Sequence, residues 1–181
     1  GGGRGDHDTG SGAMILRTAR LVLRRATWDD LPALHRVFSN PAAMRYWSRP
    51  EHETEAETRR WMADLVDPPE GCVDFVLERA GEVIGKAGAW RLPEVGFILH
   101  PDHWRQGLAR EAMEAVIDHL ATTRPDLPGL TAEVDPRNGA SLALLTRLGF
   151  RETHRAERTL LWKDEWCDSV YLARPRGAIS R

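Results

Sequence analysis

Two segments that join an apolar run, a loop of small residues and a helical pattern constrain this chain most. Residues 96–109 read GFILHPDHWRQGLA, an apolar strand followed by a loop that contains Gly107 and Ala109. Residues 138–150 read NGASLALLTRLGF, a polar cap followed by a helix and a turn. The first loop leaves backbone N–H groups unpaired at the start of a helix, where such groups bind phosphate. Together the segments predict two strand–helix units that hold a phosphate-bearing ligand.

The rest of the chain predicts a mixed arrangement of strands and helices around these units. Apolar patterns predict strands at residues 21–23, 73–79, 83–90, 94–100, 130–134, 153–162 and 167–173. Cap signals and helical spacing predict helices that begin at Thr27 (with Asp30), at Asn40-Pro41 and at Thr54 (with Glu57), and helices over residues 107–121 and 140–148. Consecutive strand–helix units imply one parallel pair with a crossover, and the hairpins at both ends are antiparallel. The fold class is therefore α/β (α+β).

Composition narrows the class of protein. The chain has 181 residues, of which 41% are hydrophobic and 29% charged, and these values suit one domain with a sizeable core. We assign that domain to residues 14–175, with a short C-terminal tail at 176–181. Residues 1–13 are Gly-rich and cannot repay the entropy of ordering, so we interpret them as a disordered extension or cloning remnant.

The net charge and the pattern of apolar residues argue against nucleic-acid binding, membrane spanning and export. The formal charge is −2 and the pI about 6.4, with no basic patch for nucleic acid. No apolar run is long enough to cross a membrane, and no signal-peptide pattern is present, so we expect a cytoplasmic protein. Cys72 and Cys167 match no metal spacing and are interpreted as reduced structural thiols, so no metal site is expected.

The two motifs, in this order, resemble those of the GCN5-related N-acetyltransferase (GNAT) superfamily. Within it the chain is most similar to the branch of ribosomal-protein N-terminal acetyltransferases. The resemblance also covers the opening LRTARLVLR at residues 16–24 and the closing DSVYLA at residues 168–173. It implies a central, mostly antiparallel sheet of about seven strands, one splayed parallel pair and helices on both faces. It further implies transfer of an acetyl group from acetyl-CoA to an amine.

The resemblance also assigns residues to the cofactor. The loop and helix start would cradle the pyrophosphate through Trp104, Arg105, Gln106, Gly107, Leu108, Ala109 and Arg110, and the backbone of Phe97, Ile98 and Leu99 would pair with pantetheine amides. Asn138 would hydrogen-bond the cofactor arm, although it also suits a helix cap. Trp104 stands where Gln or Arg is usual, and simple packing remains open for it. Gly96 is expected to mark the bulge that splays the strand.

Catalysis requires a neutral amine and a protonated leaving thiolate. Glu94 and Glu133 are the candidate bases, with Glu94 preferred because many relatives carry an acidic residue there, and water alone remains open. The tyrosine that protonates the thiolate in much of the superfamily is replaced here by Leu145. In the resembling branch a serine takes that role, so we predict Ser141 as its counterpart.

The acceptor itself is less defined by the sequence. Tyr46, Trp47 and Trp90 suggest an aromatic acceptor pocket, with Glu133 beside it. The acceptor would be a protein N-terminal α-amine or a small-molecule amine, and the protein a monomer or homodimer. The alternative is a catalytically silent module that binds or senses acyl-CoA, since Leu145 removes a catalytic hydroxyl.

Overall fold

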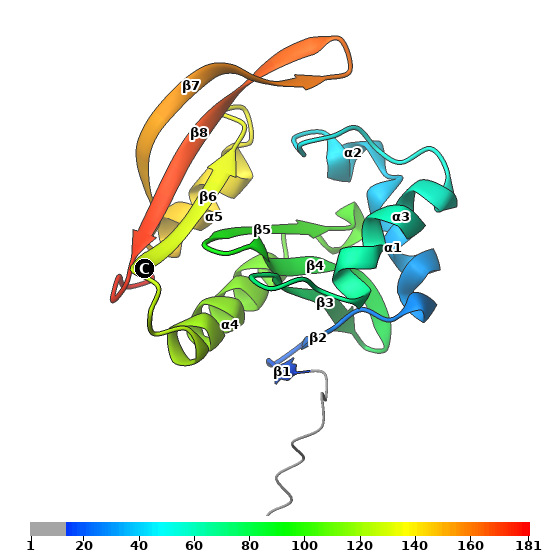
Figure 1. Cartoon of the computed structure of the whole chain (residues 1–181), viewed down its shortest axis with the longest axis horizontal. Coiled ribbons are helices and arrows are strands. Elements are labelled where there is room, and N and C mark those ends of the chain that lie inside the picture. The colour runs from blue at the N-terminus through cyan, green and yellow to red at the C-terminus, as the bar shows by residue number, and fades with distance from the viewer. Residues whose placement is uncertain (1–13) are drawn as a thin grey trace, which may run out of the picture.

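The computed structural model describes residues 14–181, so the predicted extension at 1–13 lies outside the described residues. The chain forms one eight-stranded sheet in the order β1-β2-β3-β4-β5-β6-β8-β7 (Figure 1). The mixed α/β class predicted from the sequence is confirmed. Among the described residues, no helix is both long and apolar enough to cross a membrane.

The first five strands make an antiparallel half-sheet. They are β1 (Ile15–Arg17), β2 (Val22–Arg24), β3 (Val73–Arg79), β4 (Glu82–Arg91) and β5 (Glu94–Leu99). β1 is a strand that the sequence did not predict, and it brings the sheet to eight strands. It is only three residues long, and it pairs with β2 through Leu16 and Leu23. Such a short segment carries too little alternation to be recognised from sequence.

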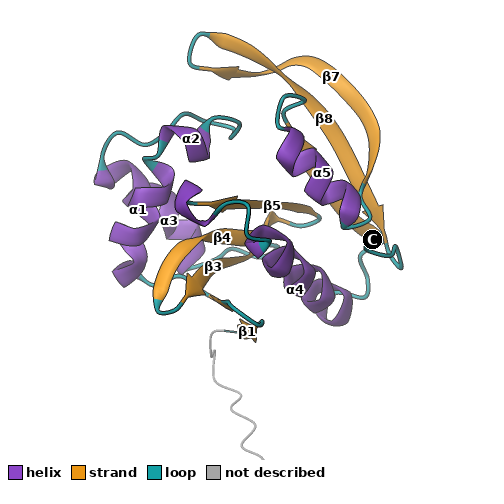
Figure 2. Cartoon of the chain, turned by 180° about the vertical axis from the view of Figure 1, so that it is seen from behind, coloured by secondary structure: helices purple, strands orange, loops and turns teal. Residues whose placement is uncertain are grey.

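Helices cover both faces of this half-sheet (Figure 2), as expected. On one face lie α1 (Leu31–Phe38), α2 (Pro41–Met44) and α3 (Glu55–Val66). Phe38 and Met62 there pack against Val76, Val83 and Ile98 of the strands. On the other face lies α4 (Leu108–Thr123), packed against alternate residues of the same strands. Side chains along β3 to β5 point alternately to the two faces of the sheet and therefore contribute to two apolar cores.

The caps predicted for the first helices are present. Asn40 Oδ1 accepts from Ala43 N at 3.0 Å, and Thr54 Oγ1 accepts from Glu57 N at 3.3 Å. Thr27 N donates to the Asp30 carboxylate at 2.8 Å, but a 3₁₀ turn (Trp28–Asp30) precedes α1. The helix start predicted at Thr27 was therefore early by one turn.

The second half-sheet holds β6 (Gly129–Val134), β7 (Arg151–Trp162) and β8 (Glu165–Pro175), with α5 (Gly139–Arg147) beside them. β5 and β6 are parallel, but their register holds only where Glu94 meets Thr131. The two strands are splayed beyond that point, as expected. The irregularity expected at Gly96 lies instead in its partner strand, where the β4–β5 register shifts after Gly88. Gly88 has φ +148°, and a Cβ there would lie 2.3 Å from Val73 O.

Candidate active site

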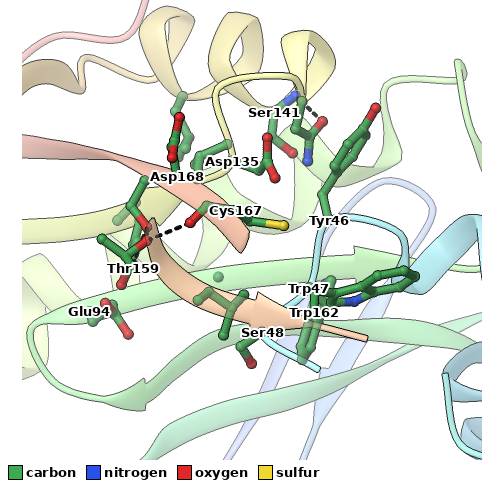
Figure 3. Close-up of a pocket in the computed structure, with 18 of the residues that line it drawn as sticks. Tyr46, Trp47, Ser48, Glu94, Asp135, Ser141, Thr159, Trp162, Cys167 and Asp168 are labelled. Carbon is green, nitrogen blue, oxygen red and sulfur yellow. Dashed lines mark hydrogen bonds between the residues drawn. The ribbon is translucent and has the colours of Figure 1, made fainter. Parts of the chain in front are cut away.

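A cavity of about 320 Å³ lies where β5 and β6 part (Figure 3). Its wall comes from four places: the splayed strands, α5, the β7–β8 hairpin, and the loop after α2. Many residues singled out in the sequence line it together: Tyr46, Trp47, Trp90, Glu94, Phe97, Glu133, Asn138 and Ser141. Of the other predicted strand residues, Ile98 and Leu99 are buried in the two apolar cores instead.

The wall formed by α5 begins with its cap. Asn138 Oδ1 accepts from Ser141 N at 3.2 Å, so Asn138 does cap the helix. Asn138 and Ser141 both line the cavity, and Figure 3 shows Ser141 at its wall. Leu145 lies one turn further on, 2% exposed, and contributes an apolar surface where a tyrosine would contribute a hydroxyl.

The two predicted acidic residues have different partners. Trp90, 55% exposed, donates its indole N–H to Glu94 Oε2. Glu133 Oε1 accepts from the Ser169 hydroxyl at 2.6 Å. Two of the carboxylates that line the cavity are therefore on adjacent strands, one bound to an indole and the other to a hydroxyl.

Two arginines lie beside Tyr46, a residue of the cavity wall. Arg137 donates to Asp135 from Nε at 3.0 Å and from Nη2 at 2.8 Å, and to Glu165 from Nη1 at 2.5 Å. Burial works against the Asp135 carboxylate, but the Arg137 side chain and N–H outweigh it and lower the pKa of Asp135. Arg45 and Arg137 also lie 5.3 and 5.6 Å from the Tyr46 ring centroid. Through Arg137, Asp135 therefore helps to position an aromatic wall.

A buried ion pair lies against the ring of Trp47. Lys86 Nζ lies 2.6 Å from Asp74 Oδ2, with side chains 3% and 2% exposed. The ammonium also lies 5.2 Å from the Trp47 ring centroid and 5.8 Å from that of Trp61. The sequence analysis missed this pair. Its signal is a lysine in the middle of the apolar run IGKAGA, in the strand that follows the one holding Asp74.

A second ion pair joins two distant segments next to Trp162, which lines the cavity. Lys163, at the tip of the β7–β8 hairpin, lies 2.9 Å from Glu51 in the loop before α3. The lysine bond lowers the pKa of Glu51. Next to it, Trp162 lines the cavity, and its indole N–H is buried without a partner among the described residues. This contact joins segments 112 residues apart, so no local pattern could indicate it.

The predicted phosphate loop lies at the start of α4. Gly107 caps the helix with φ +76°, a conformation that glycine adopts without strain. Trp104 donates its indole N–H to Leu99 O at 2.9 Å, and this bond fixes the loop to the end of β5. Arg20 Nη1 donates to Gln106 O at 2.8 Å, while its Nε lies 2.9 Å from Glu111. The loop is thus held from outside, and the first N–H groups of α4 have no partner within the helix.

Side chains of this loop are engaged within the protein. Gln106 Oε1 accepts from Arg79 at 2.8 Å, and Arg110 pairs with Glu114 at 2.9 Å and donates to Arg181 O. Arg105 is exposed, with φ +60°. Leu108 is buried in the core, and Ala109 packs against it. The loop therefore offers a ligand mainly its backbone, as the glycine pattern suggests.

Among residues 14–181, no group of three or more His, Cys, Asp or Glu side chains could hold a metal ion. Both cysteines are free thiols. Burial raises the pKa of the Cys72 thiol. Cys167 is buried in the cavity wall, and Arg137 Nη2 lies 3.4 Å from its sulfur.

Comparison with known proteins gives consistent results. A family model described as an acetyltransferase (GNAT) domain matches residues 20–151. The uncharacterized N-acetyltransferase YoaA of Bacillus subtilis is 31% identical over 149 residues, which cover 76% of this chain and 83% of the relative. The uncharacterized N-acetyltransferase p20 of Bacillus licheniformis is 29% identical over 147 residues, covering 76% and 82%.

Solved structures share the fold at lower identity. RimL, a ribosomal L7/L12 α-N-protein acetyltransferase, superposes with a TM-score of 0.78 at 22% identity, covering 96% of this chain and 98% of that one. Spermidine N-acetyltransferase from Vibrio cholerae, solved with CoA and spermine, gives a TM-score of 0.74 at 21% identity, covering 89% and 98%. The same fold thus occurs in proteins named for a protein acceptor and for a small amine.

Proposed function

Since this chain belongs to the GNAT acetyltransferase family, we propose that it transfers an acetyl group from acetyl-CoA to a primary amine in a ternary complex. The acceptor is a protein N-terminal α-amine or a small-molecule amine, and we place the reaction in the cytoplasm. The observation that carries the proposal is the cavity between β5 and β6, because it brings the α5 cap and two carboxylates to one space.

The cofactor fits the start of α4 and the parted strands. A pyrophosphate at the α4 N-terminus would accept from the backbone N–H groups between Arg105 and Arg110 and gain from the helix dipole. Gly107 adopts φ +76°, which would strain a residue with a side chain, and this turn leaves the backbone N–H groups of the loop accessible to a phosphate. Phe97 and its neighbours in β5 would pair with the pantetheine amides where β6 has moved away. Asn138 would bind the same arm with the part of its amide that does not cap α5.

Bound acetyl-CoA supplies the thioester, and the chain supplies position and proton handling. Holding amine and thioester together accounts for most of the acceleration. Backbone N–H groups of β5 would stabilise the carbonyl oxygen as charge develops on it. Ser141 would donate to the departing thiolate, since Leu145 cannot. Glu94 or Glu133 would take the excess proton of the amine.

The second candidate function is an acyl-CoA-binding module without turnover. Leu145 favours it, because this buried residue places a hydrocarbon surface in the cavity wall.

A thiol-release assay with acetyl-CoA tests both candidates. The parent is assayed against alkylamines, amino acids, polyamines and short peptides, beside Asn138→Ala and Ser141→Ala. Thr146→Ala serves as the control, because Thr146 lies on α5 and its hydroxyl donates only to Leu142 O at 2.8 Å. We expect turnover with one acceptor class, reduced by both site variants and retained by the control. Binding of CoA without release from any acceptor would favour the silent module, and absence of CoA binding would contradict both.

A further inference from the structure

β7 is interrupted where it passes the cavity. Its register with β8 shifts between Ala156 and Leu160, and Arg158 in this interval has φ +50°. Asp168 holds the irregular segment by accepting from Arg158 N at 2.9 Å. The irregularity carries Thr159 to the cavity, where Figure 3 shows its side chain between Asp168 and Glu94.

Thr159 begins a chain of short hydrogen bonds across three strands. Thr159 Oγ1 lies 2.6 Å from Ser169 Oγ, and Ser169 Oγ lies 2.6 Å from Glu133 Oε1. Ser169 is only 4% exposed, so it does not exchange these partners for water. All three side chains border the same cavity.

The direction of this chain follows from the chemistry of its members. An ionised carboxylate only accepts, so the single proton of Ser169 is directed to Glu133. Thr159 must then donate to Ser169, since the carbonyl of Cys167 is more distant at 3.3 Å. This arrangement leaves the lone pairs of Thr159 free to accept from a donor in the cavity. The hydrogen bonds are therefore oriented in one direction, from Thr159 in the cavity wall toward the exposed residue Glu133.

Resting on the proposed function, we infer that Thr159, Ser169 and Glu133 form the route by which the acceptor ammonium loses its excess proton. The ammonium donates to Thr159, Thr159 passes its own proton to Ser169, and Ser169 passes its proton to Glu133. The neutral amine then forms the C–N bond as the C–S bond breaks. The second nitrogen proton goes to Ser141 as Ser141 gives its own proton to the thiolate, and Glu133 returns the first to water. An amine that arrives neutral brings no excess proton and does not need the route.

Glu94 is less suited to this task. Its partner, the indole N–H of Trp90, is a donor only and cannot pass a proton on, whereas a hydroxyl can accept and donate together. The other ionisable side chains around the cavity are Arg45, Tyr46, Glu94, Asp135, Cys167 and Asp168, with Arg137 paired to Asp135. Asp135 and Asp168 are held by Arg137 and by Arg158 N.

The test compares two acceptors in four variants. The first acceptor is the amine that the parent enzyme uses best, and the second is its analogue with a CF3 group on the carbon that bears the nitrogen, which is mostly neutral at pH 7. The variants are Thr159→Val, Glu133→Gln, Thr159→Ser and the control Thr153→Val. Thr153 lies on the same strand, outside the cavity, and its hydroxyl donates to Tyr171 O at 3.2 Å.

We expect Thr159→Val and Glu133→Gln to lower kcat for the first acceptor by about tenfold or more at pH 7, with KM changed less than about threefold. For the neutral analogue, kcat should change less than about threefold, because no excess proton must leave. Thr159→Ser should retain activity with both acceptors, since it keeps the hydroxyl, and so should the control.

Equal losses for both acceptors in Thr159→Val would mean a structural role and would overturn the inference, as would unchanged kcat for the first acceptor. Loss of activity in Thr159→Ser would also overturn it. A parent that releases no thiol with any amine would instead contradict the proposed function, and this inference with it.

Discussion

The part of the site that we propose for the cofactor (the cofactor side: the loop before α4 and the cap of α5) and the part that we propose for the acceptor (the acceptor side: the aromatic and charged wall of the cavity) are held by different kinds of contact. On the cofactor side, Gly107 and Asn138 act on their own helices, within three residues of the groups that they expose or cap. On the acceptor side, Lys86 with Asp74, Arg137 with Glu165, and Lys163 with Glu51 join separate segments through charge. The first side depends on local backbone geometry, and the second depends on the whole sheet being assembled.

Because of this difference, the two sides should tolerate amino-acid substitutions to different extents. Backbone binding of a phosphate ignores most side-chain changes, whereas an acceptor wall of aromatic and charged side chains changes with each of them. We therefore expect substitutions on the cofactor side to raise KM for acetyl-CoA, and substitutions on the acceptor side to alter KM for the amine. The predictions below test that division.

The largest effect is expected from Lys86→Met, which leaves the Asp74 carboxylate buried without its partner. We expect the free energy of unfolding to fall by about 3–5 kcal/mol, as when other buried pairs are broken. Urea denaturation measures this loss. The double variant with Asp74→Asn should recover part of the stability, because it removes the isolated charge. Full stability in Lys86→Met would show that the pair does not support the acceptor side.

Gly107→Val should cost less stability but weaken the cofactor side. A β-branched residue at φ +76° is strained by about 1–2 kcal/mol, and relief of the strain would move the loop. We expect a raised KM for acetyl-CoA and an unchanged KM for the amine. Gly81→Val is the matched control, because Gly81 has φ +83° and lies in the β3–β4 turn. A similar rise in KM for acetyl-CoA in the control would contradict a local role for the loop.

Acidification should lower the free energy of unfolding through His52, which stacks on Phe38 of α1. Burial, followed by the charge of Arg49, lowers the pKa of this histidine in the folded protein. The unfolded chain then binds the proton more readily, so the stabilising contribution is present above the ordinary histidine pKa near ~6.5 and is lost as pH falls below it. Urea midpoints between pH 7.5 and 5 should fall less steeply in His52→Gln than in the parent.

His119, whose pKa burial also lowers, lies against Phe75 and provides the comparison. His119→Gln should flatten the same pH dependence, but only His52→Gln should make KM for the amine less sensitive to pH. If both variants keep the full slope of the parent, neither histidine is responsible.

The smallest effect on stability is expected from Lys163→Ala. Its partner Glu51 is partly exposed and Lys163 more so, and pairs of this kind contribute about 0–1 kcal/mol. KM for the amine should nevertheless change, because the pair joins the hairpin to the loop above the cavity. Arg155→Ala breaks a comparable exposed pair with Glu152 on the same strand and should leave KM unchanged. An identical KM in both variants would mean that Lys163 does not affect acceptor binding.

The division between the two sides also explains what the sequence could predict. The loop at Gly107 and the cap at Asn138 were predictable, because each signal lies within a few neighbouring residues. The sequence placed Glu94 and Glu133 on adjacent strands, and Glu94 was preferred on resemblance alone. Their hydrogen-bond partners, Trp90 and Ser169, are set by the folded strands and could not enter that choice. Thr159 was not predicted at all, because its position depends on the register shift between Ala156 and Leu160 in β7, and no residue type there indicates such a shift.

The parting of β5 from β6 has a consequence for how the protein meets other chains. A strand edge with unpaired backbone groups usually invites pairing with a foreign strand. Here the two inner edges border a cavity that is also walled by α5, the β7–β8 hairpin and the loop after α2. Because these elements flank the open edges, a slender, flexible molecule has easier access to the unpaired backbone groups than a second polypeptide strand with side chains on both faces. Unpaired strand edges that would promote aggregation on the surface therefore select, inside the fold, for ligands of a narrow shape.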